Sequence, residues 1–333
     1  MKFNSTKMLF YMFLIMGTLM SLSSNNWLGG WMGLEINMIS FIPIIYSNFN
    51  YYTSESSMSY FIIQSMSSTL LIFGLVFSCL MNFSFLFDYY FIFISLCMSM
   101  GMAPFHMWLP GVVEGTSWES CFLLLTWQKL ALLFLISNVL INYDLLILMV
   151  MITLIIGSFG GLNQGSLKKI FSYSSINMLG WIMMGMLSSN VMWMVYFIFY
   201  SFMIFGLFMF FHLMEINYLN QVVFGSFCSF NKIYFCICMF SIGGLPPLAG
   251  FLPKWMIIQS VIFYGNYFVC LIMVLSSLIT LFYYIRICYL IILVNSVKMK
   301  FNYLSNFNFY LVNYFFFFNL FGFILILFFK TFI

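Results

Sequence analysis

Long apolar runs, separated by short polar or turn-forming stretches, make up almost the whole chain of 333 residues. A helix rises 1.5 Å per residue, so about 20 apolar residues cross a bilayer. Runs of that length between polar breaks predict about eleven membrane-spanning helices. They lie near residues 8–24, 26–47, 58–81, 86–112, 116–137, 141–161, 166–187, 190–212, 233–260, 264–291 and 308–329. The predicted fold is all-α and polytopic.

Two proline motifs with the same spacing indicate an internal repeat. Pro104–Pro110 reads PFHMWLP and Pro247–Pro253 reads PLAGFLP, and glycines precede both (Gly101; Gly243 and Gly244). The offset of 143 residues moves the motif by five predicted spans, so the second copy is inverted in the membrane. Proline lacks the N–H group and clashes with the preceding turn, so each motif should interrupt its helix. Paired breaks in inverted halves are typical of transporters, although proline and glycine are also generally common in membrane helices.

Composition excludes several classes of protein. Hydrophobic residues make up 64% of the chain and charged residues only 5%, against about 25% charged in soluble domains. The net charge of +4 is too sparse for a nucleic-acid surface. The eight cysteines show no CxxC spacing, and no glycine-rich nucleotide loop or histidine pair at metal spacing occurs. We therefore expect no bound cofactor, no metal and no redox chemistry in this chain.

Three charged residues lie inside predicted spans: Glu35, Lys129 and Lys254. A charge near the bilayer centre costs about 2.5–3.5 kcal/mol, so each needs a reason. Burial favours the neutral form of both groups and pairing restores both charges, which is how a proton relay is built. The alternatives are a fixed ion pair between helices or a lysine that reaches the interface. His106, inside the first proline motif, could pass protons between water and a central lysine, or simply satisfy a neighbouring hydrogen bond.

The distribution of charges predicts an orientation. An odd number of spans places the termini on opposite sides of the membrane. Basic residues gather at span ends on the N-terminal side, and the other side has one lysine and two aspartates; these are Lys2, Lys7, Lys168, Lys169, Lys232, Lys298 and Lys300 against Lys330, Asp88 and Asp144. The positive-inside rule then directs the N-terminus to the cytoplasm or the mitochondrial matrix.

Segments across nearly the whole chain resemble the NADH dehydrogenase subunit 2 family, the antiporter-like membrane subunits of respiratory complex I. They read GxWxGLEIN with Glu35, GMAPFHMWLP, LTWQKLA with Lys129, SLKKIFSYSSINMLGW, and SIGGLPPLAGFLPKW with Lys254. The resemblance implies a single antiporter-like domain over residues 1–333. Within it, residues 1–140 and 141–291 would form inverted five-helix repeats with one broken helix each. Residues 292–333 would supply a connector and a final helix.

The resemblance also implies a function. Subunits of this family help translocate protons across the mitochondrial inner membrane, coupled to electron transfer from NADH to ubiquinone. The N-terminus would face the matrix and the C-terminus the intermembrane space. NADH, FMN, iron–sulfur clusters and ubiquinone would bind elsewhere in the complex. Other membrane-arm subunits and inner-membrane lipids, with cardiolipin as a candidate, would be the partners. Glu35, Lys129 and Lys254 match motif positions that carry the relay charges.

Two positions depart from the family pattern. Ser99 stands where most relatives have a lysine two residues before Gly101, and Met178 stands where a histidine is common. The first change removes the usual close partner of Glu35, so either Lys129 or water replaces it, or the channel is weakened. Two other functions therefore stay open: a free-standing cation/proton antiporter, and a membrane-arm subunit that serves mainly as a scaffold.

Overall fold

The computed structural model describes residues 5–46, 50–80, 85–139, 143–224 and 229–293. In these ranges every regular element is an α-helix, and the only β-type pairing is an isolated bridge between Ser166 and Tyr218. The chain divides into two compact units, Met1–Met149 and Val150–Ile333, here called unit 1 and unit 2. The predicted all-α fold is confirmed for the described part of the chain.

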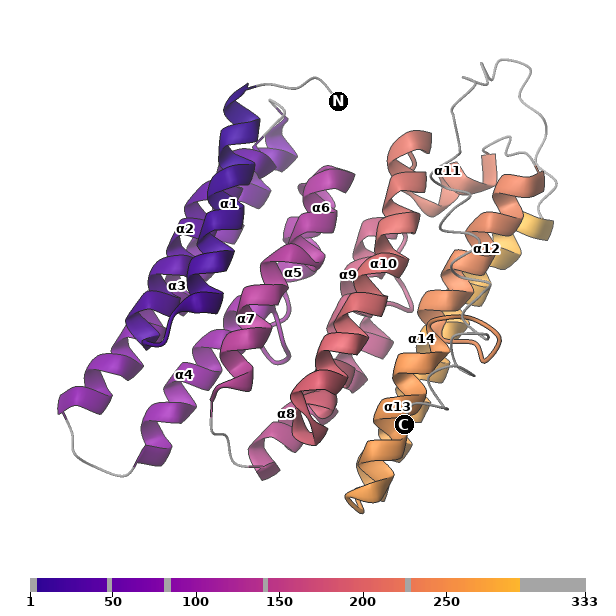
Figure 1. Ribbon diagram of the computed structural model, residues 1–333. Coiled ribbons are helices and arrows are strands. Elements are labelled where there is room, and N and C mark those ends of the chain that lie inside the picture. Colours follow the sequence, from indigo (N-terminus) through magenta and orange to yellow (C-terminus); the bar gives the residue numbers. More distant parts are fainter. Residues whose placement is uncertain (1–4, 47–49, 81–84, 140–142, 225–228, 294–333) are drawn as a thin grey trace. The chain divides into compact units, whose positions relative to one another are not determined.

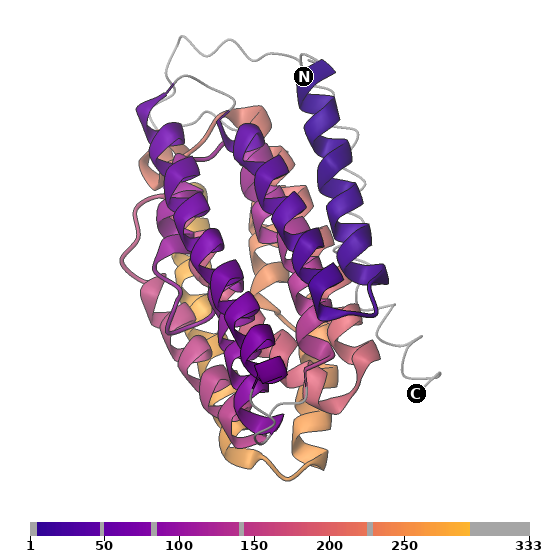
Figure 2. The ribbon, with the colours of Figure 1, turned by 90° about the vertical axis from the view of Figure 1, so that its left-hand side faces the viewer.

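Unit 1 is a bundle of helices that run alongside one another (Figures 1 and 2). Helix α2 packs between α1 and α3, α3 also contacts α4 and α5, and α7 contacts α1, α2 and α4. Phe41 and Tyr60 pack edge to face with ring centroids 5.3 Å apart. The helices are α1 (Ser5–Ser23), α2 (Trp27–Ile45), α3 (Tyr51–Leu80), α4 (Phe85–Met100), α5 (Trp108–Gly115), α6 (Trp118–Leu125) and α7 (Trp127–Ser137).

Unit 2 is built around helix α9, most of whose residues are buried. Helices α10, α13 and α14 all contact α9, and α12 contacts α10 and α14. Helix α8 (Tyr143–Gly160) contains the boundary between the units. The others are α9 (Leu167–Ser188), α10 (Asn190–Met214), α11 (Leu219–Phe224), α12 (Ser229–Gly243), α13 (Phe251–Phe263) and α14 (Tyr267–Leu293).

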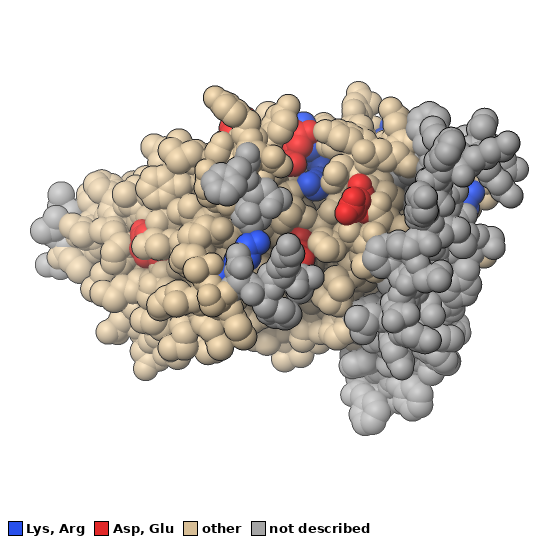
Figure 3. All heavy atoms as spheres, turned by 90° about the horizontal axis from the view of Figure 1, so that it is seen from above, with Lys and Arg blue, Asp and Glu red and all other residues tan. Residues whose placement is uncertain are grey.

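Eight helical segments of the described chain are long and apolar enough to cross a membrane. They coincide with eight of the predicted spans, although α3 begins at Tyr51 rather than near residue 58. Figure 3 shows few charged side chains among the uncharged surface of one face. A polytopic membrane protein is therefore confirmed. The predicted span 308–329 lies outside the described residues, so the count of eleven stays a prediction.

The two remaining described spans are broken at the proline motifs, as the sequence predicts. Helix α4 ends before the break at residues 101–107, and α12 ends before the break at residues 244–250. Gly101 and Gly244 have φ of 74° and 82°, a conformation that favours glycine. The next residue of each break donates its N–H to a carbonyl five residues earlier: Met102 to Cys97 (3.0 Å) and Leu245 to Phe240 (3.2 Å). Both helices thus end in the same glycine cap.

Candidate functional site

Glu35 lies on α2, half-buried, beside a small polar cavity of unit 1. The cavity has a volume of about 20 Å³, and roughly 10–15 Å³ on this scale holds one water molecule. Serine hydroxyls from α3 and α4 line it, together with Gln64; the serines are Ser67, Ser68, Ser95 and Ser99. A carboxyl group is therefore held at the wall of a cavity that has room and polar partners for water.

Lys129 lies in the first turn of α7, just after a break at Thr126 that the sequence analysis did not predict. The side chain is 3% exposed, and its Nζ has no hydrogen-bond partner among the described residues. It lines a second cavity, of about 30 Å³, with Asn37 and Gln128. Both amide atoms of Asn37 and Nε2 of Gln128 likewise lack a partner within the described chain. Buried polar groups are almost always hydrogen-bonded, so their convergence on one cavity indicates bound water.

Ser99 and Gln64 line both cavities and so connect them. The Gln64 Nε2 donates a hydrogen bond to the Ser99 carbonyl oxygen over 3.0 Å, which joins α3 to α4. The Ser99 hydroxyl donates to the Leu96 carbonyl over 2.9 Å and keeps its oxygen lone pairs for another donor. The position of the family lysine therefore lies between Glu35 and Lys129, as a hydroxyl. The sequence analysis missed Gln64, which stands alone among the serines of α3.

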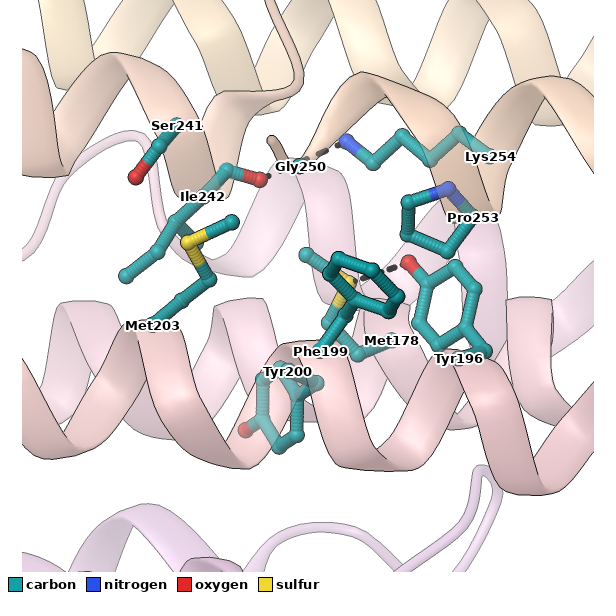
Figure 4. A pocket seen from close by; sticks show the side chains of 10 residues that line it. All are labelled: Met178, Tyr196, Phe199, Tyr200, Met203, Ser241, Ile242, Gly250, Pro253 and Lys254. Atoms are coloured by element: carbon teal, nitrogen blue, oxygen red, sulfur yellow. Dashed lines mark hydrogen bonds between the residues drawn. The ribbon is translucent and has the colours of Figure 1, made fainter. Parts of the chain in front are cut away.

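Lys254, in the first turn of α13, reaches back to the broken end of α12 (Figure 4). Its side chain is 4% exposed, and Nζ donates to the carbonyl oxygens of Gly243 (2.7 Å) and Ile242 (3.4 Å). Nζ also lies 5.7 Å from the centroid of the Trp181 ring. Terminal carbonyls carry the negative end of the helix dipole, so this position suits a cation. Lys254 is thus partnered, unlike Lys129.

The cavity beside Lys254 has a volume of about 20 Å³ and an aromatic wall. Tyr196 and Tyr200 of α10 line it, and Met178 of α9 stands at the position of the family histidine (Figure 4). The Tyr196 hydroxyl donates to the Met178 sulfur over 2.6 Å. Sulfur is a weak acceptor, so Met178 cannot replace a histidine as a proton carrier.

His106 lies in the first break and is 8% exposed. Its Nδ1 is 3.1 Å from the Pro104 carbonyl oxygen, which only accepts, so Nδ1 carries the hydrogen. His106 lines neither the Glu35 cavity nor the Lys129 cavity. The relay role of His106 therefore stays a prediction. In the described chain, no group of three or more His, Cys, Asp and Glu side chains is placed to hold a metal ion.

Comparison with known proteins gives the family. The family model described as "NADH:quinone oxidoreductase/Mrp antiporter, TM" matches residues 24–280. NADH-ubiquinone oxidoreductase chain 2 of Anopheles gambiae is 41% identical over 307 residues, covering 90% of each chain. The protein of the same name from Locusta migratoria is 41% identical over 292 residues, covering 86% of this chain and 85% of the relative.

A solved structure supports the fold. A chain of respiratory complex I from Thermus thermophilus with bound aureothin superposes with a TM-score of 0.78 at 20% identity. The match covers 86% of this chain and 71% of that one. The extent and identity of the curated matches go further, since they span nearly the full length of both partners. The chain belongs to the NADH-ubiquinone oxidoreductase chain 2 family.

Proposed function

We propose that this chain is a membrane-arm subunit of mitochondrial NADH:ubiquinone oxidoreductase that conducts protons while electrons pass from NADH to ubiquinone in other subunits. One observation carries the proposal: Glu35 and Lys129 face adjoining water-sized cavities that share Gln64 and Ser99 as walls. Titratable side chains held at membrane depth at a cost of kilocalories are functional by default. Membership of the family and the fold shared with a complex I chain support it.

Water and hydroxyls connect the two titratable groups in this proposal. A proton on Glu35 passes to water in its cavity, then past the Ser99 hydroxyl to water beside Lys129. A serine cannot hold a charge of its own, so water must carry the proton across the place where relatives have a lysine. The unpartnered atoms of Asn37, Gln128 and Lys129 in the described chain provide the sites that hold this water.

Lys254 is a second proton-holding group, within unit 2. The charged form donates to the carbonyl oxygens of Gly243 and Ile242 at the end of α12. A neutral amine binds carbonyls more weakly, so loss of the proton loosens the contact between α13 and the broken end of α12. Protonation and the geometry of the break are therefore coupled, and this coupling is what a proton pump needs.

The two units also support the proposed inverted repeats. The breaks at Gly101 and Gly244 share one cap and lie 143 residues apart. A second correspondence comes from Gly17, which leaves room for the side chain of Asn37, and Gly157, which leaves room for Asn177. Both members of the second pair stand 140 residues after those of the first. We assign the repeats to residues 1–140 and 141–291, followed by a connector and a last helix in residues 292–333.

The cellular setting follows from the same proposal. The chain would lie in the mitochondrial inner membrane, with the N-terminus in the matrix and the C-terminus in the intermembrane space. Its partners would be the other membrane-arm subunits and inner-membrane lipids such as cardiolipin. NADH, FMN, iron–sulfur clusters and ubiquinone would be held by other parts of the complex.

The test is Glu35→Gln and Lys129→Met, each in assembled complex reconstituted into vesicles. We expect fewer protons pumped per NADH oxidised, or slower coupled turnover. Unchanged stoichiometry in a fully assembled complex would support the scaffold alternative. A chain that purifies alone and exchanges Na⁺ for H⁺ without NADH oxidation would support the free-standing antiporter.

A further inference from the structure

A cluster of buried tyrosines in unit 2 has no place in the relay described so far. Tyr196 and Tyr200 come from α10, and Tyr283 and Tyr284 come from α14. All four are at most 5% exposed, and two are fully buried. Burying a hydroxyl without a good partner costs about 1–3 kcal/mol. The chain uses 46 phenylalanines, which would fill the same space without that cost.

The hydroxyls approach one another in sequence. Tyr196 and Tyr200 line the Lys254 cavity, as Figure 4 shows. The Tyr283 hydroxyl interacts electrostatically with Tyr200 and with Tyr284, and the Tyr283 and Tyr284 rings pack edge to face at 4.7 Å. These two hydroxyls lie close to each other, yet neither closes a hydrogen bond of standard geometry in the described chain. Spacings of this kind are ones that a proton crosses by small hydroxyl rotations or one water molecule.

The far end of the cluster approaches the start of α9. The Tyr284 hydroxyl interacts with Ser174, seven residues into α9 and so about 10 Å from its first residue. The Tyr283 ring lies against Gly161, where an added Cβ would be 3.0 Å from the ring. Gly161 belongs to the turn between α8 and α9, and α9 begins with Leu167 followed by Lys168 and Lys169. Consecutive lysines mark this end as the edge of the membrane.

We propose that the hydroxyls of Tyr196, Tyr200, Tyr283 and Tyr284, together with Ser174, carry protons between the Lys254 cavity and the aqueous end of α9. Each oxygen accepts a proton on one side and releases its own on the other. All groups end neutral, and no oxidant or other reactant is needed. The inference rests on the proposed function. It gives Lys254 a route to water that does not use the histidine position occupied by Met178.

The test is Tyr283→Phe/Tyr284→Phe, which removes two hydroxyls and keeps both rings. In assembled complex in vesicles, we expect NADH-driven proton pumping to slow about tenfold, because one lost hydrogen bond of the relay is worth a factor of that order. Tyr289→Phe is the matched control on α14, since Tyr289 is 60% exposed, and it should pump normally. If the double variant fails to assemble, each single variant carries the same expectation.

A rescue experiment separates relay from packing. Adding Met178→His to the double variant should recover pumping, because an imidazole beside Tyr196 can carry protons. A merely structural defect would not respond. Normal pumping in the double variant would overturn the tyrosine route. If Lys254→Met lowers pumping at the same time, the proposed function stands and only the route is wrong. If Lys254→Met and Lys129→Met both pump normally, the proposed function itself fails.

Discussion

Replacing Lys129 with methionine should make the protein more stable and less active at once. The side chain is 3% exposed, and no described residue accepts a hydrogen bond from its Nζ. Methionine has a similar length and no charge, so it fills the same space against α4 and α2. A lysine at the centre of a membrane helix costs about 2.5–3.5 kcal/mol, and apolar replacement of buried charges often stabilises by about 1–4 kcal/mol. We expect a gain of about 1–3 kcal/mol in the stability of the subunit.

Two measurements on the same preparation check this expectation. Unfolding of a large complex is not two-state, so the readout of stability is the apparent melting temperature of the assembled complex in detergent. The readout of function is the number of protons pumped per NADH oxidised in vesicles. Lys129→Met should melt at the same or a higher temperature and pump fewer protons. Lys7→Met, at the start of α1 and only half-buried, is the matched control and should change neither value.

The opposite pattern would refute the reasoning. A lower melting temperature with normal pumping would mean that Lys129 holds helices together through a contact that the isolated chain lacks. Lys129 would then be a structural residue, and the cavity beside it would not be part of a proton route.

Three further substitutions test the site and the breaks. Gln64→Leu removes the hydrogen bond to Ser99 and a polar wall of both cavities, so we expect about 1 kcal/mol of destabilisation, read as a lower melting temperature, with slower pumping. Gly101→Ala should destabilise by about 1–2 kcal/mol, because φ is 74° there, again measured by melting. Gly244→Ala should cost a similar amount and also slow pumping, because its added Cβ would lie 2.9 Å from the Lys254 Nζ; equal pumping in the two alanine variants would argue against a role for Lys254.

The breaks in the helices could be predicted from the sequence because their cause is local. A proline cannot donate to the preceding turn, and a glycine admits positive φ, so the two proline motifs predict interruptions wherever they occur. The spans are equally local, since length and apolar composition define them. The break at Thr126 carries no proline or glycine, and the sequence contains no signal for it.

The connections within the site depend on packing and could not be predicted. Glu35, Lys129 and Lys254 stand out because charge is rare in this chain. Gln64 does not stand out, since an uncharged amide among serines is compatible with lipid, partner or cavity. Only the packing of α3 on α4 brings it to the Ser99 carbonyl. The buried tyrosines are similarly hidden, because 21 tyrosines occur in the chain and their burial depends on tertiary structure.

Density for water at membrane depth tests the central claim most directly. In a high-resolution map of the assembled complex, we predict ordered water in the two cavities on either side of Ser99, hydrogen-bonded to Asn37, Lys129 and Glu35. Empty cavities, or a direct ion pair between Glu35 and Lys129 that closes them, would contradict the account.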